Sequence, residues 1–237
     1  MPAIYGQAIG RREVVLEPVV AQAPDSWNYG SLVTADGWTD EGGLTPGTLA
    51  AVAGTPTPLV GLPGATVAAD AFVDANSERN TSHLAMFAWI RPTTIVGADR
   101  FIVGKLSGST GFRWYIRSTV TQQYLVAYTA GGTVVFTENV TSISLNTWQQ
   151  VGAIWNPDTN YATFFHNGVA TRSATGVGGT GAIVASSVDM RIGTNAVGGS
   201  PFAGDLALPR NLDARLLPHI DEYARHLFES ERHIFGV

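Results

Sequence analysis

Six side chains form the strongest candidate for a ligand-binding surface in this sequence. Sugars are recognised by aromatic rings that stack on them and by nearby polar groups that fix their orientation. Successive side chains of a β-strand point to opposite faces of the sheet, so residues two positions apart share a face. On this basis one outer sheet face is predicted to carry the aromatic and basic residues Phe87, Trp89, Arg113, Tyr115, Arg117 and Tyr124.

Two interpretations of this predicted face stay open. In the first, the rings and guanidinium groups bind a ligand such as a glycan. In the second, the same hydrophobic surface is covered by another segment of the chain, either the N-terminal region or a terminal helix. An apolar face of this size needs a partner in both cases, so the sequence does not choose between them.

The strands that position these residues are expected between Ser82 and Asp205. This stretch consists of short segments that are rich in β-branched and aromatic residues and are separated by Gly, Asn, Asp, Thr or Pro, which is the pattern of strands joined by turns. Ala130-Gly131-Gly132 and His166-Asn167-Gly168 mark two hairpin turns. No helix-period segment interrupts the series. The stretch therefore predicts an all-β antiparallel sandwich.

Alternation within one of these strands also predicts part of the core. Between Gly111 and Ser118, three apolar residues alternate with two arginines and a tyrosine. Because alternate residues share a face, the apolar set is expected to face the core and the other set to face outward. The expected core residues of this strand are Phe112, Trp114 and Ile116.

The two ends of the chain differ from the central strands. Residues 1–57 contain one expected strand, Arg12–Val20, followed by a run rich in Gly, Pro, Thr and Ala, and they are predicted to form an extended N-terminal arm. An apolar stripe of helical period predicts a short C-terminal helix at 218–230. The sandwich, with this helix included, is expected over residues 58–237. The stripe consists of Ile220, Tyr223, Ala224, Leu227 and Phe228.

Composition excludes several classes of function. Of the 237 residues, 45% are hydrophobic and only 14% are charged, so the chain can bury a core but is poor in charge for a free surface. Its net charge is -5 and its 14 Lys and Arg residues are scattered, which argues against nucleic acid as a partner. Cysteine is absent, so no disulfide or cysteine-based metal site is expected. Residues 1–20 show no secretory leader pattern, and no stretch of the sequence approaches the roughly 18 uninterrupted apolar residues of a membrane span, so no membrane insertion is expected.

Calcium is the metal that the loop residues allow. Ca²⁺ takes several oxygen ligands, usually carboxylates and backbone carbonyls in loops. No spacing singles out a cage, and Asp residues in turns commonly accept backbone hydrogen bonds instead. The sequence therefore leaves two alternatives open, a protein without a cofactor and a protein that binds calcium. The candidate ligands at loops or strand ends are Asp74, Asp99, Asp158 and Asp205.

The chain resembles the laminin-G-like, concanavalin A-like jelly rolls, in the branch often found in bacterial and bacteriophage proteins. The resemblance covers the chain from Pro58 to the C-terminus, and implies a jelly roll that closes with a short helix. The matching motifs are Phe87-Ala88-Trp89-Ile90-Arg91-Pro92, Ile102-Val103-Gly104-Lys105, Thr147-Trp148-Gln149-Gln150-Val151, Phe165-His166-Asn167-Gly168, and Arg191-Ile192-Gly193 leading to Phe202-Ala203-Gly204-Asp205.

The resemblance implies fold more firmly than function, because this sandwich hosts lectins, adhesion modules, glycosidases and structural parts. Glycosidases of the fold carry paired carboxylates on alternate residues of one strand, and no strand of this sequence contains such a run. The chain is therefore expected not to be an enzyme.

A virion protein is the leading functional hypothesis. Modules of this kind normally act outside cells, whereas this sequence shows no signal peptide and no cysteine. A bacteriophage virion component meets both conditions, since it is made in the host cytoplasm and is extracellular after release. The hypothesis is a non-enzymatic capsid decoration or tail protein that displays the jelly roll. Its arm is expected to bind other virion proteins, and the protein is expected to form an oligomer or to be bound in an assembly. A cell-surface glycan is the candidate ligand of the jelly roll. The alternatives are a free carbohydrate-binding or adhesion module and, third, a glycoside hydrolase.

Overall fold

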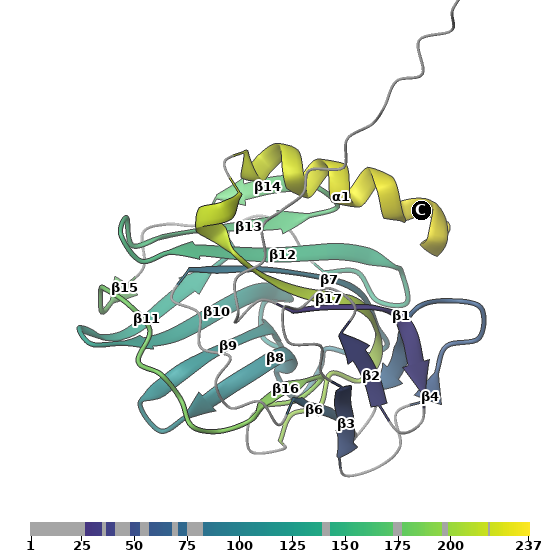
Figure 1. Cartoon of the computed structure of the whole chain (residues 1–237), viewed down its shortest axis with the longest axis horizontal. Coiled ribbons are helices and arrows are strands. Elements are labelled where there is room, and N and C mark those ends of the chain that lie inside the picture. The colour runs from purple at the N-terminus through teal and green to yellow at the C-terminus, as the bar shows by residue number, and fades with distance from the viewer. Residues whose placement is uncertain are drawn as a thin grey trace, which may run out of the picture.

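Two antiparallel sheets packed face to face, with one helix on the outside, make up the fold (Figure 1). The computed structural model describes residues 27–34, 37–40, 48–52, 57–67, 71–74, 83–138, 143–172, 177–195, 199–217 and 219–237. Its elements are β1 (Trp27–Thr34), β2 (Gly37–Asp40), β3 (Thr48–Val52), β4 (Thr57–Pro58), β5 (Ala65–Val67), β6 (Ala71–Asp74), β7 (Leu84–Pro92), β8 (Arg100–Ser107), β9 (Thr110–Arg117), β10 (Gln122–Thr129), β11 (Gly132–Thr137), β12 (Gln149–Asn156), β13 (Tyr161–His166), β14 (Val169–Arg172), β15 (Val177–Gly178), β16 (Met190–Ile192), β17 (Gly204–Asp213), the 3-10 helix Ala214–Leu216 and α1 (Ile220–Phe235).

The first sheet, sheet A, has the strand order β4-β5-β17-β7-β12-β13-β14. The second, sheet B, has the order β1-β2-β3-β6-β16-β8-β9-β10-β11-β15. All of these pairings are antiparallel, and the start of β1 also pairs with β17 of sheet A. This arrangement confirms the predicted all-β antiparallel jelly-roll sandwich.

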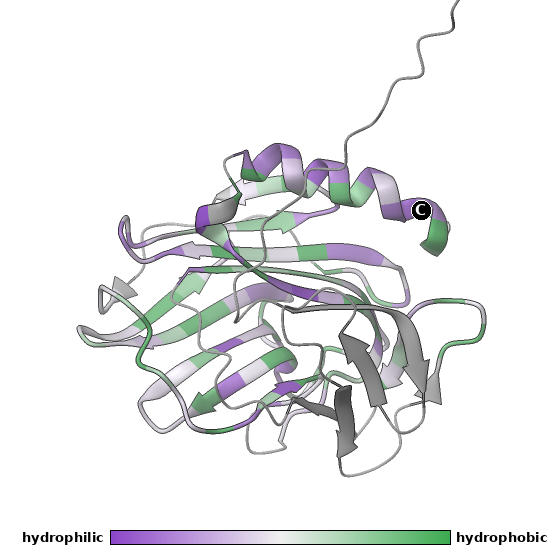
Figure 2. Ribbon diagram, in the orientation of Figure 1, coloured by the Kyte–Doolittle hydropathy of each residue, from purple (hydrophilic) through white to green (hydrophobic). Residues whose placement is uncertain are grey.

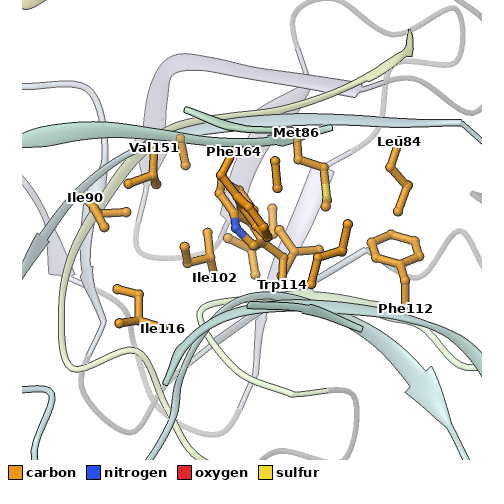
Figure 3. Packing of buried hydrophobic residues seen from close by; sticks show 14 of the residues in the cluster. Leu84, Met86, Ile90, Ile102, Phe112, Trp114, Ile116, Val151 and Phe164 are labelled. Carbon is orange, nitrogen blue, oxygen red and sulfur yellow. The ribbon is translucent and has the colours of Figure 1, made fainter. Parts of the chain in front are cut away.

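The main core lies between the inner faces of the two sheets (Figure 3). Alternation decides its membership, because the odd and even residues of each strand fall on opposite sides. Burial of each large apolar side chain contributes about 1.5–3 kcal/mol. The predicted core residues Phe112, Trp114 and Ile116 are confirmed, since all three are buried in this cluster. They face Leu84, Met86, Ile90, Val151 and Phe164 of sheet A.

Helix α1 lies across the outer face of sheet A (Figure 1). It confirms the predicted terminal helix but runs to Phe235, five residues beyond the predicted end. The extension is stabilised by packing, because the Phe235 ring stacks on Trp89 with 4.4 Å between ring centroids. Gly236 then ends the helix in the left-handed conformation, with φ of 71°. In the described part of the chain, no helix has the length and apolar character needed to cross a membrane.

A buried polar contact fixes this helix to the sheet. The indole Nε1 of Trp89 donates to Oε2 of Glu231 at 2.7 Å, and the Arg210 guanidinium forms an ion pair with the other oxygen of the same carboxylate. Glu231 is 8% exposed. Hydrophilic and hydrophobic residues alternate along α1 (Figure 2), as expected for an amphipathic helix with one face against a sheet.

A second buried polar group joins the two sheets inside the sandwich. On β10 of sheet B, Gln123 receives a hydrogen bond from the Trp114 indole and donates from Nε2 to the Phe165 carbonyl of sheet A and to Oε1 of Glu138. The backbone N–H of Gln123 donates to Oε2 of the same carboxylate. Burial is the main cause that raises the pKa of Glu138, from an ordinary value of 4.5 to about 7.

The turn between β13 and β14 brings the chain close to α1. Asn167 and Gly168 both have positive φ, 49° and 74°, as a two-residue type I′ hairpin turn requires. A Cβ atom on Gly168 would lie 2.9 Å from Cβ of Phe228 and 3.0 Å from Cα of Arg225. Glycine is therefore needed at this position for conformation and for close packing of the helix.

Part of the predicted N-terminal arm lies in the sheets. Within residues 1–57, strands β1, β2 and β3 extend sheet B as far as β6. The expected strand Arg12–Val20 lies outside the described residues. The boundary at residue 57 and the role of the arm as a tether stay predictions.

Candidate functional site

Four of the six predicted ligand-binding residues share the outer face of sheet B. Arg113, Tyr115 and Arg117 alternate on β9 with the core residues, and Tyr124 on β10 pairs directly with Tyr115. Paired residues of neighbouring strands point to the same face. The four side chains therefore meet on one surface, as the alternation predicts, and their role in ligand binding stays a prediction.

The other two, Phe87 and Trp89, do not belong to that surface, which corrects the prediction of a single face. They lie on β7 in the middle of sheet A, and their rings are 1% and 0% exposed. Phe87 packs with Tyr223 of α1, and Trp89 stacks on Phe228 and Phe235. The helix covers both. Alternation shows which residues of one strand share a face, but it does not show to which sheet the strand belongs.

An aromatic row forms the floor of the candidate site on sheet B. The rings of Phe101 and Tyr115 stack with centroids 5.0 Å apart, and Tyr124 follows Tyr115 at 5.7 Å. The row runs across β8, β9 and β10, because Phe101 pairs with Tyr115 and Tyr115 with Tyr124. These rings and Val126 form a small cluster of their own outside the main core.

Arginine side chains lie on this aromatic floor. The guanidinium carbon of Arg113 is 5.8 Å from the Phe101 ring centroid and 5.3 Å from that of Tyr115. The guanidinium of Arg117 lies 4.9 Å from the Tyr124 ring centroid, and its side chain is exposed. These are cation-π distances. With the rings mostly buried, the groups that this face offers to a ligand are the guanidinium groups and not free ring faces.

Two members of this surface were missing from the predicted set. Phe101 precedes a register shift in β8, so simple alternation along that strand does not assign its face. Arg191 lies on β16, and the register Arg191–Gly104–Arg113 across β16, β8 and β9 places it on the same face as Arg113. The sequence does contain a signal for this placement, because Arg191 lies between two apolar residues, Met190 and Ile192, that face the core. Alternation would therefore have assigned Arg191 to the outer face.

The charge of this face comes from the arginines. Burial raises the pKa of Tyr115 above its ordinary value of 10.0, although Arg113 acts in the opposite direction, so the phenol is neutral at neutral pH. The Asp99 carboxylate is the nearby acidic group that acts on Tyr115 and Arg117. It accepts hydrogen bonds from the backbone N–H of Ser118 at 3.0 Å and from its hydroxyl at 3.4 Å. Positive charge on an aromatic floor is suited to an anionic group.

Three of the four calcium candidates lie at separate places with different partners. Asp205 is buried and binds Arg91 at 2.6 Å and the Thr66 hydroxyl at 2.5 Å. Asp158 lies 3.3 Å from Nε2 of His83, and Asp99 is held by Ser118 as described. Asp74 ends β6. In the described ranges no group of three or more His, Asp or Glu side chains gathers at one point, so the geometry assigns no calcium site.

Sequence comparison identifies the family. Residues 67–216 match the concanavalin A-like lectin/glucanases superfamily. The chain belongs to this superfamily. The match includes β7 to β17, and thus every strand that carries the arginines and aromatic rings of the candidate site. None of the curated protein sequences compared with the chain matches it.

Solved structures of distant proteins share the fold. Trypanosoma rangeli sialidase superposes with a TM-score of 0.59 at 13% identity, covering 89% of this chain and 33% of the sialidase. The receptor-binding domain of botulinum neurotoxin D gives 0.56 at 11% identity, covering 88% of this chain and 53% of that domain. The chain thus spans about a third to a half of these proteins. At such identities the similarity establishes the fold alone.

Proposed function

We propose that this protein is a non-enzymatic carbohydrate-binding module that binds its glycan on the outer face of sheet B. One observation carries the proposal. The outer face of sheet A is covered by α1. The outer face of sheet B carries Arg113 and Arg117 on an aromatic floor, and Arg191 lies on the same face. Side chains that hydrogen-bond and carry charge above apolar rings are the composition expected of a sugar-binding surface.

The family supports a lectin-like role without deciding it. The superfamily is named for lectins and glucanases, and one fold hosts both activities. The neurotoxin domain that shares the fold is described as a receptor-binding domain, and a related neurotoxin domain was solved in complex with SialylT. These properties belong to those proteins, and they extend to this chain only as part of the proposal.

The chemistry of the face favours binding over hydrolysis. A glycosidase of the usual kind needs two carboxylates about 5 to 9.5 Å apart on either side of the scissile bond. The groups that define the candidate site are guanidinium groups, and the adjacent carboxylate, Asp99, accepts two hydrogen bonds from Ser118. Arginines of this kind hold a ligand but do not supply the acid and the nucleophile of that reaction.

The virion setting is the second part of the proposal. In it the jelly roll is displayed on a bacteriophage particle, assembled in the host cytoplasm and extracellular after release, and the N-terminal region contacts other virion proteins. The absence of cysteine from the sequence is consistent with assembly in a reducing compartment. Immunogold labelling of particles with an antibody raised against residues 58–237 tests this setting, and particles without label would contradict it.

A glycan microarray tests the carbohydrate-binding function. The full-length protein is expected to bind at least one glycan, and an Arg117→Glu variant, which reverses an exposed charge on the face, is expected to lose that binding. Arg225→Glu is the matched control, because Arg225 is exposed on α1 over the opposite sheet. The proposal fails if no glycan binds, or if the two variants lose binding equally.

A further inference from the structure

We propose that Arg113 and Arg191 form a subsite for an anionic group of the glycan, a carboxylate or a sulfate. This inference rests on the proposed function, since it names the class of sugar that the face would take. A carboxylate, which is planar, and a sulfate, which is tetrahedral, both present negatively charged oxygens. Guanidinium groups bind such oxygens through paired N–H donors.

The strand register brings the two arginines toward one point. Arg113 on β9 pairs with Gly104 on β8, and Gly104 pairs with Arg191 on β16. Two strand spacings separate the two Cα atoms by about 10 Å, and the residue between them has no side chain. Two arginine side chains that start this far apart on one face can both reach an anion above Gly104.

Both guanidinium groups have unused hydrogen-bonding capacity. The Nε atoms of Arg113 and Arg191 are buried and have no hydrogen-bond partner. Among the described residues, neither arginine takes part in a salt bridge, whereas Arg91, Arg210, Arg215 and Arg232 each do. A buried polar group without a partner destabilises the fold and calls for an explanation such as an unseen ion or ligand.

The electrostatics of the row also favour an added anion. The net charge of the chain is -5, so the chain as a whole has more acidic than basic groups. In the register of this row, the residue between the two arginines is Gly104, which carries no charge. Like charges at this spacing repel, and partial burial reduces the screening of that repulsion by water. The Phe101 and Tyr115 rings under Arg113 hold its guanidinium in place without neutralising it. An anion between the two groups would relieve the repulsion.

Glycans that differ only in the acidic group test the subsite. The probes are an array of matched triples on several cores, for example lactose, its 3′-sialylated form with a carboxylate and its 3′-sulfated form. We expect the acidic members to bind at least tenfold more tightly than the neutral one, and Arg191→Gln to remove that difference. Arg191→Lys should lose less, because it keeps the charge but not the paired donors. Arg225→Gln on α1 is the matched control and should bind as the wild type does.

The two acidic members of each triple also identify the source of the charge. Preference for the sialylated glycan indicates a carboxylate, and preference for the sulfated one indicates a sulfate. The inference is overturned, and the proposed function retained, if neutral and acidic glycans bind alike or if a folded Arg191→Gln variant binds like the wild type. Circular dichroism and thermal unfolding verify that each variant is folded.

An ion titration keeps the subsite testable if no glycan binds. Sodium sulfate is added to the ¹⁵N-labelled full chain, with sodium chloride at equal ionic strength as the control, and the arginine Nε–H signals are followed by NMR. Sulfate should shift the signals of Arg113 and Arg191 and leave that of Arg225 unchanged. Such shifts without any glycan binding would support the anion subsite and refute the carbohydrate-binding function. Absence of the shifts would overturn the subsite.

Discussion

The stability of the sandwich should depend on the protonation of Glu138. This carboxylate lies inside the sandwich next to Gln123, is 0% exposed and has a pKa raised from 4.5 to about 7, mainly by burial. Between these two pH values the native state binds more protons than the unfolded state. The stabilising contribution is therefore fully present below pH 4.5, falls as the pH rises toward 7, and is lost above it.

The size of this effect follows from the shift. A change of one pKa unit corresponds to 1.36 kcal/mol, so the shift from 4.5 to about 7 predicts a loss of about 3 kcal/mol between pH 4.5 and pH 8. His166 acts in the opposite direction. Burial lowers its pKa below the ordinary value of 6.5, so its contribution to stability is lost as the pH falls below that value. The two effects partly offset each other in the wild type.

A Glu138→Gln variant separates them. Glutamine does not titrate, so the difference in unfolding free energy between wild type and variant reports on Glu138 while the contribution of His166 cancels. The absolute stability of the variant is expected to differ from that of the wild type, because its amide must meet two N–H donors of Gln123. The pH dependence of the difference is therefore the diagnostic quantity. Urea unfolding from pH 4.5 to 8 should show the wild type losing about 3 kcal/mol relative to the variant. Parallel curves would refute the reasoning.

Two further predictions concern the attachment of α1. Glu231→Ala removes the acceptor of the Trp89 indole and the ion-pair partner of Arg210. It should lower the unfolding free energy by about 2–4 kcal/mol and speed amide hydrogen exchange in α1. Unchanged exchange would contradict this. Gly168→Ala places a Cβ against Phe228 at a φ of +74° and should cost about 1–3 kcal/mol in urea unfolding, whereas a neutral result would contradict the close packing.

Local periodicity predicted the layers of this fold well. Alternation on β9 placed Phe112, Trp114 and Ile116 in the core and Arg113 on the outer face. The helical stripe predicted α1, although its final turn was missed. That turn depends on a contact with Trp89, which is 146 positions away from Phe235 along the chain, and no local pattern reports such a contact.

The candidate site was predicted only in part, because it is assembled from strands that are distant in sequence. The pairing of Arg191 with Gly104, and of Gly104 with Arg113, is set by the topology of sheet B. Phe87 and Trp89 have the same alternating pattern as the true members of the face, yet they belong to the other sheet and lie under α1. Sequence pattern assigns a residue to one side of its strand, and tertiary pairing decides what that side meets.

The central claim is that a glycan binds on the outer face of sheet B, and mapping by NMR tests it most directly. The ¹⁵N-labelled full chain is titrated with the glycan that gives the strongest array signal. The account predicts that the backbone amides that shift cluster in β8, β9, β10 and β16, around Arg113 and Arg191. Shifts confined to α1 and the sheet A strands beneath it, or no shifts at saturating glycan, would contradict it.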